Sequence, residues 1–184
     1  MKMLTKAPEA FQTDRLHFRR PSPADAQAIF YRYAGDPAVT RYLSWPTHRT
    51  VADTYAFVEW SDAEWERSPA GPYLLFTHED RGKRVLGSTG LLFQNPLVAS
   101  VGYALAQDAW GMGYASEALQ AMVGLARGIG VCQLNAICHA EHQASARVLQ
   151  KCGFIAEGVA AHPTRFPNLD GAVFASVLNF SMRL

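Results

Sequence analysis

Two glycines at the start of a predicted helix could hold a phosphate group. Gly111 and Gly113 lie in the segment Trp110-Gly111-Met112-Gly113-Tyr114-Ala115-Ser116-Glu117, between a strand-like run at 99–105 and a helical run at 115–129. The first N–H groups of a helix have no partner within the helix, and the helix dipole adds partial positive charge there. Because glycine has no Cβ, an anion can approach its backbone closely. The segment therefore predicts an anion-binding loop.

The elements that must position this loop alternate between strands and helices along the chain. Strands are predicted over 15–19, 73–77, 85–93, 99–105, 131–139, 154–159 and 172–180, helices over 23–33, 51–67, 115–129 and 144–151, a helical turn at 38–43, a hairpin turn at 79–82 and a Pro-rich loop at 162–170. No internal repeat or linker interrupts this order, so we expect residues 1–184 to form one domain. The order implies a mixed α/β sheet covered by helices.

Composition narrows the class of protein. Hydrophobic residues make up 49% of the chain and charged residues 18%, which is typical of a soluble globular protein with a sizeable core. The formal net charge is +1 and no basic stripe appears, so we expect no nucleic-acid partner. No apolar signal core or bilayer-length run occurs, and the three cysteines form no CxxC pair. These features predict a cytoplasmic protein without a membrane partner.

Three segments, taken together, resemble the GNAT N-acetyltransferases and, within them, the RimJ/RimL-like branch. The first is Thr13-Asp14-Arg15-Leu16-His17-Phe18-Arg19, which is similar to an opening T-x-R-L-x-L-R. The second is Val101-Gly102-Tyr103 followed by the glycine segment. The third is Ala144-Ser145-Ala146-Arg147-Val148-Leu149-Gln150-Lys151-Cys152-Gly153-Phe154, which is similar to A-S-x-R-V-L-x-K-x-G-F. The resemblance covers about residue 11 to the C-terminus.

This resemblance implies an α+β GNAT fold, with a mixed, mostly antiparallel twisted sheet of about six to seven strands and four helices packed on both faces. It implies acetyl-CoA as co-substrate and no metal. Strand 101–105 would pair edge-on with the pantetheine arm, diverge from strand 131–139 and offer an N–H group to the thioester oxygen. The coenzyme A contacts that it implies are Tyr103, Ala104, Leu105, Trp110, Gly111, Met112, Gly113, Tyr114, Ala115, Ser116, His142, Ser145 and Lys151.

The catalytic residues are less completely specified. The resemblance places Ser145 near the sulfur as a general acid, although serine is also a good helix cap and both roles can hold. Many relatives carry Glu at the position of Ser100, so that candidate for the general base is absent from this chain. The remaining candidates for a base are Glu141 and His142, with a water relay as the alternative. His142 stands where the family motif usually has Asn, and it can both donate and accept a hydrogen bond, as the Asn amide does, only as a neutral imidazole.

The implied reaction moves an acetyl group from acetyl-CoA to a primary amine by direct attack in a ternary complex. A protein N-terminal α-amine is one acceptor. A small-molecule amine, such as an amino acid, toxin or antibiotic, is the alternative, and a non-catalytic acyl-CoA-binding protein is a third reading. Trp45, His48, Tyr55 and Phe166 are the candidate acceptor contacts, and we expect a monomer or homodimer.

Overall fold

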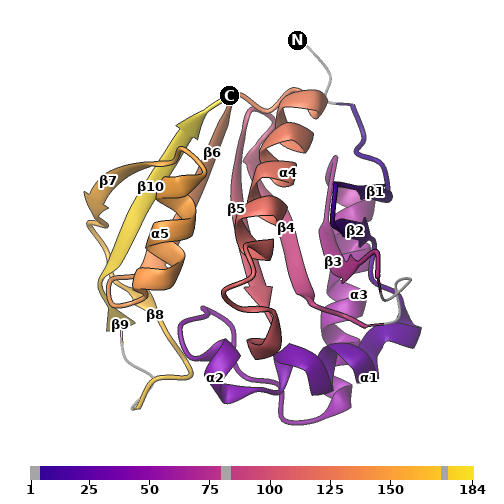
Figure 1. The fold of residues 1–184 in the computed structure, drawn as a ribbon. Helices are drawn as coiled ribbons and strands as arrows, with labels where there is room; N and C mark the ends of the chain where they lie inside the picture. Colours follow the sequence, from indigo (N-terminus) through magenta and orange to yellow (C-terminus); the bar gives the residue numbers. More distant parts are fainter. Residues whose placement is uncertain (1–4, 80–83, 171–173) are drawn as a thin grey trace.

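A computed structural model describes residues 5–79, 84–170 and 174–184 (Figure 1). Within these residues eight strands form one sheet, in the order β1-β2-β3-β4-β5-β6-β10-β7. Their bounds are β1 Ala10–Gln12, β2 Leu16–Arg19, β3 Pro72–Thr77, β4 Gly87–Asn95, β5 Val98–Leu105, β6 Gln133–His139, β7 Ile155–Val159 and β10 Val177–Arg183. A separate pair joins β8 Thr164–Arg165 to β9 Phe174–Ala175.

All neighbouring strands are antiparallel except β5 and β6, which run parallel and pair only at their beginnings. Residues Val98, Ala99 and Ser100 pair with Gln133, Leu134 and Asn135. Beyond this point β5 continues to pair with β4 as far as Leu105, and β6 continues to pair with β10 as far as His139. The two strands therefore diverge in the middle of the sheet, as Figure 1 shows.

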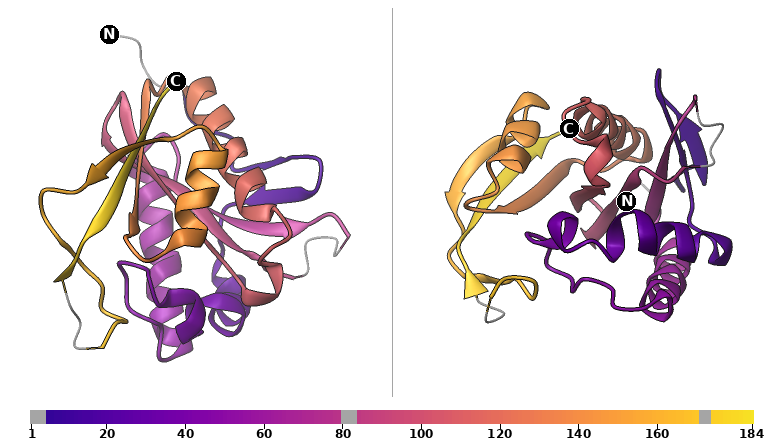
Figure 2. Two further views of the ribbon diagram at one scale, coloured as in Figure 1. Left: turned by 60° about the vertical axis from the view of Figure 1, so that its left-hand side comes forward. Right: turned by 60° about the horizontal axis from the view of Figure 1, so that its bottom comes forward.

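Helices cover both faces of the sheet. Figures 1 and 2 show α4 (Tyr114–Ile129) and α5 (Gln143–Lys151) on one face, and α1 (Ala26–Ile29) and α3 (Val51–Arg67) on the other. The short α2 (Pro37–Thr40) lies beside the open end of the β5–β6 gap. Among the described residues, no helix has both the length and the apolar character needed to cross a membrane.

Local sequence explains why the main helices form where they do. In α3 the Thr50 hydroxyl and the Asp53 carboxylate form a capping box, which pairs N–H groups that the first turn leaves free. In α4 the apolar face buries Ala118, Leu119, Met122, Val123, Ala126 and Ile129 against the sheet. Gly113 and Gly130, both in the left-handed region, flank that helix.

The predicted GNAT architecture is confirmed, but several predicted elements differ in detail. The sheet has eight strands, because the segment before residue 15 adds β1 as an edge strand. The helix predicted over 23–33 is a tight turn at Pro23–Asp25, then α1, then a wide turn at Phe30–Ala34. The loop predicted at 162–170 contains β8, and the last predicted strand is divided into β9 and β10. Residues 80–82 of the predicted hairpin turn, and residues 172 and 173 of the last predicted strand, lie outside the described ranges.

Candidate active site

A cavity of about 830 Å³ opens where β5 and β6 diverge. Val101 to Ala104 of β5 and Ala136 to Cys138 of β6 supply two of its walls. Ser145 and His142, at the beginning of α5, lie on the same cavity. The unpaired edge of β5 and the start of α5 therefore lie on the same cavity. Of the residues predicted to touch coenzyme A, those that line the cavity are Tyr103, Ala104, His142 and Ser145.

The Ser145 hydroxyl is held by Tyr103 from the facing strand. The two hydroxyl oxygens lie 3.0 Å apart, at a distance where either can donate, and the Tyr103 hydroxyl also lies 3.3 Å from the Ser145 carbonyl oxygen. Burial raises the pKa of the Tyr103 phenol to about 12, although the hydrogen bond with Ser145 acts to lower it. The phenol is therefore protonated at neutral pH. The Cys138 thiol lines the cavity too, and burial raises its pKa while a hydrogen bond with Ser145 lowers it in part.

The structure separates the two candidate bases. His142 lines the cavity, stacked on Tyr42 with ring centroids 5.0 Å apart. Burial, with a smaller effect from nearby His139, lowers the pKa of His142, so its imidazole is neutral at pH 7. Glu141 is exposed and does not line the cavity, and its backbone N–H group donates to Nδ1 of His139. His142 is thus the candidate base that the cavity contains.

The glycine segment forms the turn before α4. Gly111 has φ of +74° and Gly113 has φ of +80°, which is backbone that residues with a Cβ seldom adopt. A Cβ built on Gly111 would meet no heavy atom within 4 Å, so the space beside that glycine is open. Among the described residues, the backbone N–H groups of 111–116 have no acceptor. A free run of donors at the positive end of a 16-residue helix suits a pyrophosphate group.

Glu117, in the first turn of α4, connects this loop to the segment just before β2. Its carboxylate accepts hydrogen bonds from the Thr13 hydroxyl at 2.6 Å, the Arg15 backbone N–H at 3.0 Å and Nε of Arg15 at 2.6 Å. The Arg15 guanidinium also donates to the Met112 carbonyl oxygen at 2.9 Å and lies over the Tyr114 ring. Burial alone would raise the pKa of Glu117, but the bonds from Thr13 and Arg15 lower it overall.

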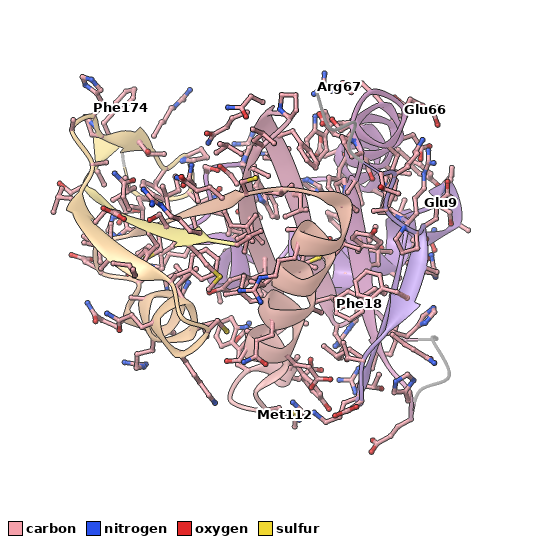
Figure 3. The ribbon with its side chains drawn as sticks, turned by 90° about the horizontal axis from the view of Figure 1, so that it is seen from above. Glu9, Phe18, Glu66, Arg67, Met112 and Phe174 are labelled. Carbon is pink, nitrogen blue, oxygen red and sulfur yellow. The ribbon has the colours of Figure 1, made fainter. Side chains whose placement is uncertain are left out.

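The remaining predicted coenzyme A contacts lie around the loop or farther away. The Trp110 indole N–H donates to the Leu105 carbonyl oxygen at 2.8 Å, which fixes the end of β5 against the loop. Met112 is exposed, and Figure 3 shows it on the side of the sheet opposite Glu66 and Arg67 of α3. Tyr114 and Ala115 pack partly against the core, and the Ser116 carbonyl accepts from the Cys152 thiol. Lys151 is exposed at the far end of α5.

Three of the four predicted acceptor contacts line the cavity. These are Trp45, His48 and Phe166. Burial lowers the pKa of His48, although the Asp53 charge acts to raise it. Tyr55 is not among the lining residues, and it lies 45% exposed on α3. Phe57 and Trp60 of the same helix line the cavity instead, because at about 100° per residue they lie roughly 160° and 140° around the helix axis from Tyr55.

The structure adds functional candidates that the sequence did not indicate. Tyr42 stacks between His139 and His142, at centroid distances of 4.8 and 5.0 Å. Asn168 joins the segment after β8 to the loop after α2: its amide nitrogen donates to the carbonyl oxygens of Thr40 and Trp45, and its amide oxygen accepts from the backbone and hydroxyl of Thr47. We call residues 164–169 the strap. No local sequence pattern around an asparagine in a loop predicts such long-range hydrogen bonds.

Within the described ranges, no group of three or more His, Cys, Asp or Glu side chains could hold a metal ion. The site therefore consists of a run of free backbone N–H groups at a helix start, an open strand edge, and a hydroxyl pair beside an aromatic cavity.

Comparisons with known proteins agree with this geometry. The chain is 28% identical over 151 residues to the uncharacterized N-acetyltransferase YoaA of Bacillus subtilis, covering 80% of this chain and 84% of that protein. The fold resembles RimL, a ribosomal L7/L12 α-N-protein acetyltransferase solved with coenzyme A in a disulfide with a cysteine, at TM-score 0.82 and 21% identity over 96% of this chain and 98% of that one. It also resembles the microcin C7 self-immunity acetyltransferase MccE, solved with acetyl-CoA and AMP, at TM-score 0.84 and 16% identity over 98% and 99% of the two chains.

The family described as "Acetyltransferase (GNAT) domain" matches residues 15–155, which is most of the chain and includes both the glycine loop and the start of α5. The chain therefore belongs to the GNAT family and is an acetyl-CoA-dependent N-acetyltransferase.

Proposed function

We propose that acetyl transfer to a primary amine takes place in the cavity between β5 and β6, with both substrates bound together. One observation carries this proposal: the unpaired edge of β5 and the Ser145–Tyr103 hydroxyl pair lie on the same cavity. An extended pantetheine arm can pair with such an edge as an added strand does. The free N–H groups of 111–116 would bind the pyrophosphate at the outer end of the same path.

The reaction needs a neutral amine, a stabilised oxyanion and a proton for the departing sulfur. The amine nitrogen attacks the thioester carbonyl carbon, so a C–N bond forms and negative charge develops on the carbonyl oxygen. A backbone N–H group of β5 on the open side would stabilise that charge. The C–S bond then breaks, giving the N-acetylated amine and the thiol of coenzyme A.

Ser145 would supply the proton that the sulfur takes up. Its hydroxyl lies on the cavity, and Tyr103 can donate to it in turn because the phenol remains protonated at neutral pH. A thiol has a pKa of about 8.5, so its thiolate leaves readily and the acid's contribution is modest. We therefore assign Ser145 the direct role and Tyr103 the role of positioning it. The alternative role, a helix cap, is not supported, because α5 begins at Gln143 with His142 at the cap position, and the Ser145 hydroxyl bonds Tyr103 instead.

His142 would take the proton that the amine loses. It lines the cavity and is neutral at pH 7, because burial lowers its pKa. The exposed Glu141 is the weaker candidate, and water remains the third route. An α-amine, with a pKa near 8, demands less from any base than a lysine amine near 10.4.

Two classes of acceptor are supported by different observations. The structural similarity to RimL supports a protein N-terminal α-amine. The aromatic lining, and the strap that Asn168 fastens to the loop after α2, support a small amine that the cavity can surround. The three free cysteines support a cytoplasmic location, and we propose a monomer or homodimer.

The test is release of coenzyme A thiol from acetyl-CoA, measured against a panel of peptides and a panel of free amines. Ser145→Ala should lower kcat by about 10²-fold, at the low end for a general acid because the leaving thiolate is stable, and should spare acetyl-CoA binding. Tyr103→Phe keeps the ring but removes the hydroxyl, and it should lower kcat by less. Because the two hydroxyls act in one chain, the double variant should be no slower than Ser145→Ala.

An unchanged kcat in Ser145→Ala would remove this residue from the chemistry. Acetyl-CoA binding without acetylation of any amine in either panel would contradict the proposed transfer and support a binding protein.

A further inference from the structure

Six ring-bearing side chains line the part of the cavity away from the glycine loop. They come from the loop after α2, from α3 and from the strap, and they are Tyr42, Trp45, His48, Phe57, Trp60 and Phe166. Several are in mutual contact: the Trp45 and His48 rings lie 5.3 Å apart, and the Phe57 and Trp60 rings 5.9 Å apart. The wall therefore holds two groups of rings: Trp45, His48, Phe57 and Trp60 in one, and Tyr42, stacked on His142, in the other.

Charge is nearly absent from the same wall. Among the described residues that line the cavity, Asp53 is the one with a charged side chain. Its carboxylate accepts hydrogen bonds from the backbone N–H groups of Arg49 and Thr50, as part of the α3 cap. An acceptor with several positive charges would find no set of partners here, and an anionic group would find no Lys or Arg on the lining.

Trp60 lines the cavity and remains 41% exposed, so part of its large ring is not covered by the protein. Phe166, from the strap, is buried and packs edge-on against His139, with centroids 4.8 Å apart. A flat group that entered between α3 and the strap would therefore meet aromatic rings from separate parts of the chain. Offset or edge-to-face contacts of this kind favour planar π systems over saturated groups of equal size.

We infer that the acceptor is a small primary amine joined by a short linker to a planar aromatic or heteroaromatic ring. This inference rests on the proposed function and specifies its acceptor. The ring lies on the aromatic wall, while the amine reaches the thioester beside Ser145 and His142. In the balanced reaction the amine nitrogen gains the acetyl group, the C–S bond breaks, and one amine proton ends on the thiol of coenzyme A. The uncharged wall suits a ring without ionised substituents.

The experiment compares kcat/KM for matched amines: 2-phenylethylamine, 2-cyclohexylethylamine and hexylamine, with Phe-Ala-Ala and Ala-Ala-Ala peptides as a second arm. We expect 2-phenylethylamine to be favoured over the cyclohexyl analogue by about 2- to 12-fold, the range of an aromatic contact beyond simple burial. Trp60→Leu should reduce that preference, and Trp60→Phe should retain most of it.

The matched control is Tyr55→Leu, which removes a ring of similar exposure, 45%, from the same helix but off the cavity lining. It should leave the preference unchanged. Equal rates for the phenyl and cyclohexyl amines, a preference unaffected by Trp60→Leu, or faster acetylation of both peptides than of the aryl amine would each overturn the inference while leaving acetyl transfer intact. No thiol release with any amine would overturn the proposed function, and the inference with it.

Discussion

Replacing Gly111 by alanine tests whether the glycine loop holds the coenzyme A phosphates. Gly111 has φ of +74°, and its added Cβ would meet no heavy atom of the protein within 4 Å. The cost to folding is then conformational only, about 1–2 kcal/mol for a residue with a Cβ in the left-handed region. For a chain of this length each kcal/mol lowers Tm by about 2–4 °C, so we expect a loss of about 2–8 °C.

The cost to binding should be larger. If a phosphate occupies the open space beside Gly111, the new methyl group holds it away from the N–H donors. Loss of one hydrogen bond to a charged group is worth about 1.5–3 kcal/mol, which raises Kd about 10- to 150-fold. The two effects can therefore be measured separately, because strain in the loop lowers the stability of the free protein, whereas loss of the phosphate contact lowers only the affinity for acetyl-CoA.

Gly158→Ala provides the matched control. Gly158 has φ of +95°, a Cβ there would also meet no heavy atom within 4 Å, and it lies on β7, away from the cavity lining. Thermal unfolding should show similar losses of stability in both variants, while titration calorimetry with acetyl-CoA should show weak binding for Gly111→Ala alone. The same Kd in both variants would refute the assignment of the phosphates to this loop.

Two further substitutions test the parts that hold the site in place. Glu117→Gln removes the charge that Thr13 and Arg15 contact, and it should weaken acetyl-CoA binding about fivefold, the value of roughly 1 kcal/mol between a charged and a neutral hydrogen bond. Because the folded-state pKa of Glu117 is lowered, the stability that its charge contributes is present above pH about 4.3 and is lost as the pH falls further. Unfolding curves in acid should therefore show no stability difference between the wild type and the variant. A difference that persists in acid would contradict the role of the charge. Asn168→Ala removes hydrogen bonds to Thr40, Trp45 and Thr47 and should raise KM for the amine while sparing Kd for acetyl-CoA. Asn95→Ala, which loses a bond to Leu97 in the β4–β5 turn, is its control, and equal amine KM values in the two variants would count against a strap that shapes the acceptor site.

The parts of the site that follow from local sequence were predictable. Gly111 and Gly113 lie at a helix start, where the need for backbone donors and a left-handed turn is readable from residue type. The alternation of strands and helices, together with the three motifs, likewise sufficed for the GNAT architecture. These features depend on contacts between residues close in sequence, or on motifs whose position in the fold is known for the family.

The aromatic wall of the cavity was less predictable, because it depends on which side of α3 faces the cavity. Tyr55, Phe57, Trp60 and Trp65 place aromatic rings on several sides of α3, so periodicity alone does not choose the cavity side. Trp65 is buried in the core, Phe57 and Trp60 line the cavity, and Tyr55 faces away from it. Asn168 and Tyr42 are further examples, since their partners are distant in sequence or belong to another element.

If the glycine loop binds coenzyme A, the bonds from Thr13 and Arg15 to Glu117 link that binding to the stability of the first edge of the sheet. β1 has three residues and pairs with β2 alone, so this edge has few interactions of its own. By thermodynamic linkage, any ligand that orders the start of α4 should also raise the free energy of local opening of the β1–β2 hairpin. The N-terminal hairpin would then be coupled to the coenzyme site, and shortening the chain at that end should change the affinity for coenzyme A.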